Sequence, residues 1–245
     1  MDDLERVEQK HGLRLPEAYR SMQAAGWLDV EASENPDYFW LSEAEWMPLD
    51  EIADYQPEEY HKPGFVPFAS EGDGSHWCWW PSVHPGKVVL CPRDCEEGEF
   101  YAPSFTGFLY RRLLDYARCV SDKEEHEIRQ YLRASATRLS RHLPTLWKDT
   151  LNDLASAQWV QQFSPNGREV GLGLLTQERY QEIVQRDLTF PLLDQVFEWM
   201  HPLTEDEAET ATIWREVIEA DPTSPVEDKM ARVEAEKARQ RVNTL

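Results

Sequence analysis

The chain has 245 residues, of which 46 are acidic and 25 basic, so its formal net charge at pH 7 is −21. This length suffices for one large domain or two ordinary ones. The charge excludes a nonspecific grip on nucleic acid, which needs clustered Lys and Arg, and no apolar run approaches the ~20 residues of a membrane span.

The compartment is predicted from the first residues and from the cysteines. Residues 1–5 are acidic and helix-forming, unlike the basic and then apolar start of a signal peptide. Four cysteines in a chain of this length do not make a disulfide scaffold. We therefore expect a reduced, cytoplasmic protein whose partners are neither nucleic acids nor membranes.

Two short helices are predicted near the N-terminus. Asp2 or Asp3 can cap the first helix, and Gly12 ends it. The second helix starts at Pro16, because a proline at the first helical position loses no hydrogen bond. Gly26 can supply the left-handed residue beyond the end of that helix.

Residues 29–62 differ from the rest of the chain in their charge. They hold eleven acidic residues against Lys62 alone, with aromatic side chains interleaved. Within this stretch the pattern predicts a short strand at 38–41 and one or two helical turns at 49–55.

The middle of the chain favours β-strands. Apolar or alternating runs at 65–69, 76–80 and 87–91 are separated by turn-forming residues, and the glycine pair at 72–74 gives a strong turn signal. This spacing indicates consecutive antiparallel strands.

A longer helix follows the strands. Ser104 caps it, and its broad apolar face continues to Val120. Arg111 and Arg112 are interpreted as a pair on the surface of this helix, where neighbouring opposite charges prevent a basic patch.

Helices, then strands, then a closing helix predict an α+β fold with a mostly antiparallel single sheet and flanking helices. The composition shifts near residue 120, so we expect an α+β domain at 1–120 and a helical extension or small helical domain at 121–245. Amphipathic helical segments are expected near 124–141, 145–162, 176–187, 192–200, 204–220 and 226–242.

Several segments of the first half together resemble the SUKH superfamily. They are 13–19 (LRLPEAY), 65–69 (FVPFA), 72–74 (GDG), 76–80 (HWCWW), 88–90 (VVL) and 102–109 (APSFTGFL). The superfamily includes bacterial immunity proteins that bind and neutralise cognate toxins, many of them nucleases, and a fungal regulator of cell-wall synthesis. The resemblance therefore implies a single-sheet α+β domain that acts by binding and has no common catalytic residues.

The candidate binding surface consists of acidic and aromatic residues between 37 and 71. An acidic field speeds the encounter with a basic protein, and aromatic anchors supply affinity. The candidate contacts are Asp37, Tyr38, Trp40, Glu43, Glu45, Trp46, Asp50, Glu51, Asp54, Glu58, Glu59 and Glu71. The alternative is that these charges only solvate the protein and that the tryptophans fill the core.

A zinc site is an alternative interpretation of the middle region. His76, Cys78, His84, Cys91 and Cys95 are of the residue types that bind zinc, but their spacing lacks a paired-cysteine motif. A cysteine–histidine nucleophile lacks an orienting motif as well. We therefore expect no catalytic residues, no metal and no cofactor.

These observations predict an immunity-type binding protein that neutralises a cognate toxin domain by stoichiometric occlusion. The toxin is expected to be basic, as nucleases often are, because the chain itself is strongly acidic. A regulatory or scaffold protein that binds a cellular partner is the alternative, and a zinc-dependent enzyme is a further one.

Overall fold

A computed structural model shows the chain as two compact units, Met1–Met200 and His201–Leu245. The structure describes residues 2–29, 39, 44–58, 61–93, 95–118, 125–158, 160–163 and 169–200, together with 213, 217, 229–233, 235 and 239. The features discussed below all belong to the first unit.

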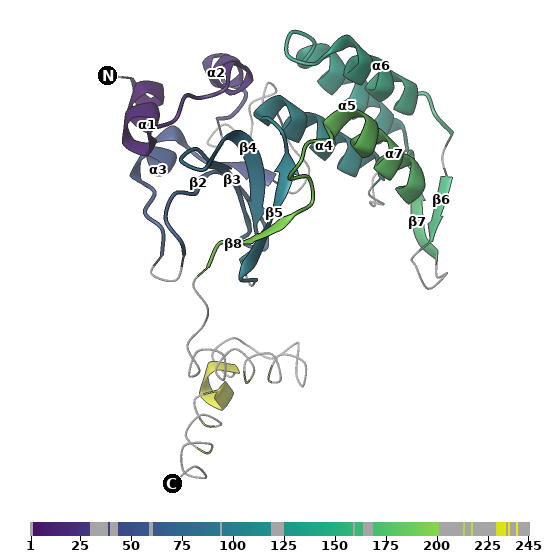
Figure 1. The fold of residues 1–245 in the computed structure, drawn as a ribbon. Helices are drawn as coiled ribbons and strands as arrows, with labels where there is room; N and C mark the ends of the chain where they lie inside the picture. Colours follow the sequence, from purple (N-terminus) through teal and green to yellow (C-terminus); the bar gives the residue numbers. More distant parts are fainter. Residues whose placement is uncertain are drawn as a thin grey trace. The chain divides into compact units, whose positions relative to one another are not determined.

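The described part of the first unit contains runs of helices and runs of strands (Figure 1). The helices are α1 (Asp3–His11), α2 (Glu17–Ala24), α3 (Leu49–Asp54), α4 (Phe105–Arg118), α5 (Glu125–Arg138), α6 (Thr145–Leu154) and α7 (Gln177–Leu188). The strands are β1 (Ala44–Trp46), β2 (Val66–Glu71), β3 (His76–Trp80), β4 (His84–Cys91), β5 (Glu97–Ala102), β6 (Val160–Phe163), β7 (Glu169–Gly173) and β8 (Val196–Glu198).

Six of these strands form one sheet in the order β1-β2-β3-β4-β5-β8, and every neighbouring pair is antiparallel. The remaining two, β6 and β7, pair with each other. The predicted α+β fold, with an antiparallel sheet and flanking helices, is confirmed.

The N-terminal helices begin and end as their sequence predicts. The carboxylate of Asp2 accepts a hydrogen bond from the backbone N–H of Glu5, which caps α1. Gly12 adopts the left-handed conformation, with φ at 61°, and so ends that helix. Pro16 precedes α2 and accepts a hydrogen bond from the backbone N–H of Arg20.

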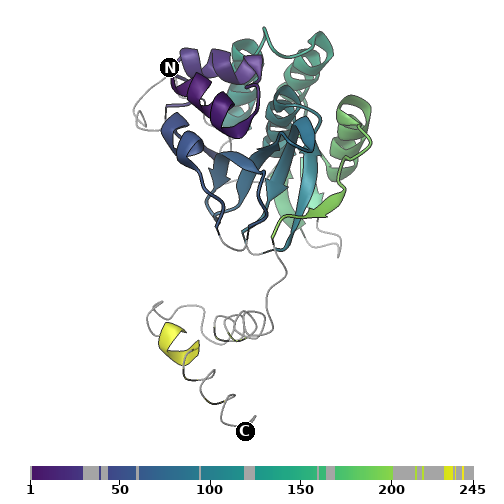
Figure 2. The same cartoon turned by 60° about the vertical axis from the view of Figure 1, so that its left-hand side comes forward.

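The main hydrophobic core lies on one face of the sheet. Phe68 of β2 stacks on Trp79 of β3, with ring centroids 4.4 Å apart. Phe105 and Phe108 of α4 meet the Phe68 ring edge-on at 5.5 and 5.2 Å. Buried residues of α1 and α2 belong to the same cluster, so these helices and α4 cover one face of the sheet (Figure 2).

The opposite face of the sheet carries a smaller cluster. It contains Cys78 and Phe100 from the sheet and Phe65, which precedes β2, together with Trp199 and Met200, which follow β8. The chain after α7 therefore contributes to the packing of this face.

The region after residue 120 is helical, as predicted, but it also contains strands. Residues 192–200 were predicted as a helix and instead contain β8, which pairs with β5. The helix predicted at 145–162 ends at Leu154, and β6 follows it. A strand that pairs with a distant edge receives its hydrogen bonds from that edge, so local periodicity does not reveal it.

Other predictions for the chain are not tested by these elements. The segments at 204–220 and 226–242 lie almost wholly outside the described residues, as does the strand predicted at 38–41 apart from Phe39. The domain boundary near residue 120 stays a prediction. Of the helices in the described part of the chain, none combines the length and apolar character needed to cross a membrane.

Candidate functional site

Three exposed acidic side chains lie within seven consecutive residues at β1 and α3. Glu45 is exposed between two buried neighbours on β1, and Asp50 and Glu51 are exposed in the first turn of α3. The burial of Ile52 and Ala53 fixes which side of this short helix faces the core. We call Glu45, Asp50 and Glu51 the α3 surface; none of the three forms an ion pair with another described residue.

Asp54, at the end of α3, differs from these three because it has cationic partners. Both of its carboxylate oxygens accept hydrogen bonds from Nη2 of Arg6 at 2.6 Å, and Nζ of Lys10 lies 3.1 Å away. The hydrogen bonds from Arg6 and Lys10 lower the pKa of Asp54. This carboxylate joins α3 to α1, so its charge is partly compensated within the chain.

Trp46 does not lie on the surface, which corrects its interpretation as an exposed anchor. It is 2% exposed, and its indole Nε1 donates a hydrogen bond to the carbonyl oxygen of Phe39 at 2.8 Å. The alternation of β1 accounts for this placement, because Glu45 and Trp46 point to opposite faces of the strand.

Glu71 is also directed into the protein rather than toward a partner. Its carboxylate oxygen Oε1 lies 3.2 Å from Nη2 of Arg112 and accepts a hydrogen bond from the indole nitrogen of Trp77 at 3.1 Å. Its backbone N–H donates to the carbonyl oxygen of Ser75, which holds Glu71 at the β2–β3 turn. This contact with Arg112 corrects the placement of Glu71 on the candidate binding surface.

The remaining predicted contacts divide into two groups. Glu58 is exposed, and its backbone carbonyl accepts a hydrogen bond from the N–H of His61. Five contacts lie outside the described residues, namely Asp37, Tyr38, Trp40, Glu43 and Glu59. Which of the predicted residues touch a partner stays a prediction.

A cavity of about 380 Å³ lies where α4 and α7 face strands β2 to β5. Arg111 and Arg112 help to line it and are only 8% and 9% exposed. The expectation that they form a helix-surface pair is therefore wrong. We call this space the α4 cavity.

Arg111 links three segments of the chain at this cavity. Its Nε donates to the hydroxyl of Tyr180 at 3.0 Å, and its Nη1 donates to the backbone carbonyl of Tyr101 at 2.6 Å. Its Nη2 donates to the carboxylate of Asp194 at 2.9 Å. Because these partners come from α7, β5 and the segment beyond α7, one guanidinium group holds all three against α4.

Glu99 of β5 is the carboxyl group of the cavity with the fewest partners. Its side chain forms no hydrogen bond or ion pair with another described residue. Burial raises its pKa; nearby Arg111 lowers it, and Asp194 and Asp115 raise it further. The ionised form of this carboxyl is thus poorly stabilised by the protein itself.

The sequence offered one signal for this cavity. Arg111 and Arg112 stand inside an apolar run, and eleven of the fourteen residues of α4 are buried. A helix that is apolar on nearly all sides is expected to be covered on nearly all sides. The distant partner Tyr180, 69 residues away, carried no local signal.

The residues considered for zinc do not form a cluster in the described part of the chain, where no group of three or more His, Cys, Asp and Glu side chains is placed to hold a metal ion. Cys78 and Cys91 are buried and reduced, whereas Cys95 is exposed. Burial, and then the contact with Cys78, raises the pKa of Cys91 well above its usual value. A thiol in such surroundings is a poor nucleophile.

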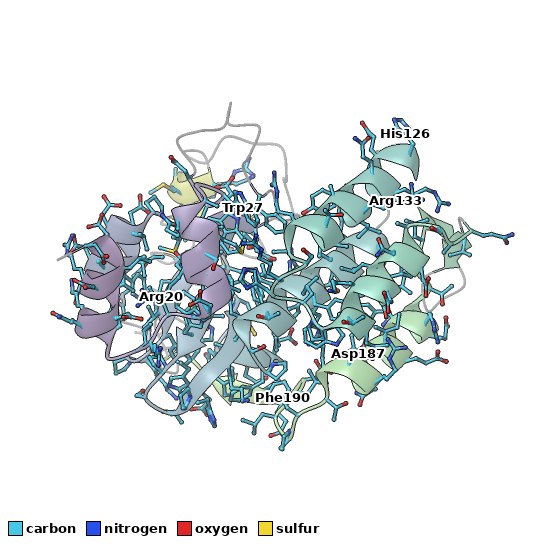
Figure 3. The ribbon with its side chains drawn as sticks, turned by 90° about the horizontal axis from the view of Figure 1, so that it is seen from above. Arg20, Trp27, His126, Arg133, Asp187 and Phe190 are labelled. Atoms are coloured by element: carbon cyan, nitrogen blue, oxygen red, sulfur yellow. The ribbon has the colours of Figure 1, made fainter. Side chains whose placement is uncertain are left out.

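Three arginines of α5 contact other elements of the fold, which the sequence analysis missed. Arg129 and Arg133 both donate to the backbone carbonyl of Ala155 at the end of α6, at 3.0 and 3.1 Å. Arg138 lies over the ring of Trp27 at 5.0 Å. Figure 3 shows Arg133 on the outer side of α5. These contacts join α5 to its neighbours.

Comparison with protein families relates the first helices and most of the sheet to a known family. A family model described as SMI1 / KNR4 family (SUKH-1) matches residues 1–111. The match covers 111 of the chain's 245 residues. The resemblance to the SUKH superfamily predicted from the sequence is therefore confirmed. Searches of curated proteins and of solved structures found no match to the chain.

The SUKH-1 match ends inside α4, at Arg111. It includes the α3 surface and strands β1 to β5, whereas α5 to β8 lie beyond it. The α4 cavity is lined from both parts, because α7 contributes Gln177 and Tyr180. The cavity therefore depends on residues that the family model does not include.

Proposed function

We propose that this SUKH protein is an immunity-type binding protein that neutralises a cognate basic toxin domain in the bacterial cytoplasm. The family supports this proposal, since SUKH domains bind partner proteins and include immunity proteins. The mechanism is stoichiometric and noncovalent: the protein covers the working surface of the toxin, so neither turnover nor a cofactor is needed.

The observation that carries the proposal is a difference in ion pairing between acidic and basic side chains in the region of the SUKH match. Three basic side chains of the first two helices are engaged within the protein: Arg6 and Lys10 with Asp54, and Arg20 with Glu8. The carboxylates of the α3 surface are exposed and form no ion pair with another described residue. Their field is therefore available to a cationic partner.

Such a surface acts mainly on the rate of association. Complementary charges bring two proteins together faster than neutral surfaces do, and salt weakens this effect. The Debye length falls from about 10 Å at 0.1 M salt to about 3 Å at 1 M. We therefore expect association with the toxin to slow markedly as salt is raised.

The test requires the partner, which co-purification with the product of the neighbouring gene would supply. Binding kinetics are then compared for the wild type and for the triple variant Glu45→Lys, Asp50→Lys and Glu51→Lys. We expect the variant to associate about tenfold more slowly at low salt, while its circular dichroism spectrum and melting temperature stay close to those of the wild type.

A matched control makes the same change in net charge elsewhere in the first unit. Asp149, Asp153 and Glu178 are exposed on α6 and α7, and their reversal to lysine also raises the net charge by six. This control should slow association much less than the α3 variant. Equal effects of the two triple variants would exclude the α3 surface as the binding site, and a neighbouring product that is not a toxin would exclude the immunity function.

A further inference from the structure

The α4 cavity has the size and the lining of a ligand site, and no residue of the α3 surface lines it. Its volume of about 380 Å³ lies at the lower end of the range for small-molecule sites. Its walls combine aromatic rings with carboxylates and guanidinium groups. The question is which kind of group this lining would accept.

The arginines that line the cavity show that its aromatic rings and carboxylates bind guanidinium groups. Each guanidinium group lies over an aromatic ring and close to a carboxylate. These sets are Arg111 with Tyr101 and Asp194, Arg112 with Trp77 and Glu71, and Arg118 with Tyr180 and Asp115. The guanidinium carbons lie 4.1 to 5.1 Å from the ring centroids, a geometry that attracts cations.

Glu99 is the carboxyl that remains after these three sets are formed. Its side chain has no hydrogen bond or ion pair with another described residue. Each of the three sets joins one guanidinium group to one carboxylate, so Glu99 is the carboxylate in excess around the cavity. A carboxylate without a paired cation attracts an added cation and repels an added anion.

We propose that the α4 cavity binds one alkylguanidinium or alkylammonium group, with the carboxylate of Glu99 as its counter-ion. The aromatic rings of the walls contact the alkyl chain. Such a group has two sources: a lysine or arginine side chain of the basic partner, which rests on the proposed function, and a free small cation, which does not.

The binding test uses the full chain and needs no toxin. Butylguanidinium is titrated into the protein by isothermal calorimetry, with butylurea as a neutral probe of nearly the same shape. We expect butylguanidinium to bind and butylurea to bind at least about tenfold more weakly, which corresponds to about 1.4 kcal/mol.

Two variants assign the binding to the cavity. Glu99→Gln removes the charge and keeps the shape, and we expect it to weaken butylguanidinium binding at least about tenfold. Glu97→Gln, two residues earlier on the same strand and exposed, is the matched control and should bind like the wild type. Circular dichroism checks that both variants keep the wild-type fold.

The outcomes separate this proposal from the immunity function. Equal binding of the two probes, no binding of butylguanidinium, or unchanged binding by Glu99→Gln overturns the cavity proposal whatever the toxin experiment gives. A blocked pentapeptide with a central arginine distinguishes the sources. If it binds as well as butylguanidinium, the cavity accepts a protein side chain; if only butylguanidinium binds, the cavity accepts a free cation.

Discussion

The acidic residues of the α3 surface and those of the α4 cavity are the same chemical groups in opposite surroundings. Asp50 and Glu51 are exposed and have no cation beside them among the described residues. Glu71 and Asp115 are largely buried and lie close to arginines. A chain with a net charge of −21 therefore contains both carboxylates available to a partner and carboxylates that hold the fold together.

Asp54 shows that this difference does not follow from sequence distance. It lies on the same short helix as Asp50, yet α1 places Arg6 and Lys10 beside it. The availability of an acidic residue to a partner thus depends on the element packed next to it. Counting acidic residues overestimates the size of a binding surface.

The largest effect should come from removing a cation of the cavity. Arg111→Met leaves the carbonyl of the buried Tyr101 and the hydroxyl of the buried Tyr180 without their donor, and it removes the cation beside the exposed Asp194. We expect a loss of about 2–4 kcal/mol in the free energy of unfolding, measured by urea titration. Arg14→Met, at an exposed position, is the control and should change stability by less than about 0.5 kcal/mol. Similar losses in both variants would contradict the cross-linking role of Arg111.

A smaller effect of opposite sign is expected at Glu99. Its pKa is raised in the folded protein, chiefly by burial, so its ionised form destabilises the native state. The folded protein holds this proton more tightly than the unfolded chain does, and stability therefore falls as the pH rises through the raised pKa. Glu99→Gln should melt at a higher temperature than the wild type at neutral pH. The difference should disappear as the pH is lowered below the ordinary glutamate range.

Removing the Asp54 ion pairs should have the smallest effect. Asp54 is exposed and its pKa is lowered by Arg6 and Lys10, so its contribution is present at neutral pH and is lost as the pH falls through the lowered value. Asp54→Asn should lower the melting temperature slightly at neutral pH and not at strongly acidic pH. Asp50→Asn, on the same helix, should leave it unchanged. If Asp50→Asn lowers the melting temperature as much as Asp54→Asn does, the Asp50 carboxylate also stabilises the native structure, and the contrast between the two residues is wrong.

Local sequence signals were sufficient wherever neighbouring residues decide the structure. The cap at Asp2, the left-handed Gly12 and the helical turns of α3 depend on a few adjacent residues, and all were predicted. The alternation in β3 likewise placed Trp77 and Trp79 on one face of a strand. The blocks that resemble the SUKH superfamily belong to this same region.

The candidate site was predicted only in part. Glu45, Asp50 and Glu51 are exposed acids, whereas Trp46 and Glu71 turned out to be directed into the protein. For Trp46 the strand alternation between Glu45 and Trp46 could have indicated burial. For Glu71 no local pattern could do so, because its partner Arg112 comes from another element.

The sequence by itself determined the acidic character of the chain, the short N-terminal helices, the antiparallel strands and the resemblance of the first half to the SUKH superfamily. Only the tertiary structure decided which charges are neutralised, that residues 196–198 complete the sheet, and that α7 closes a cavity against α4. The physical reason is the separation along the chain between the residues that interact. Capping, turns and alternation act between adjacent residues, whereas ion pairs and strand pairing join groups that lie up to 136 positions apart, as Lys62 and Glu198 do.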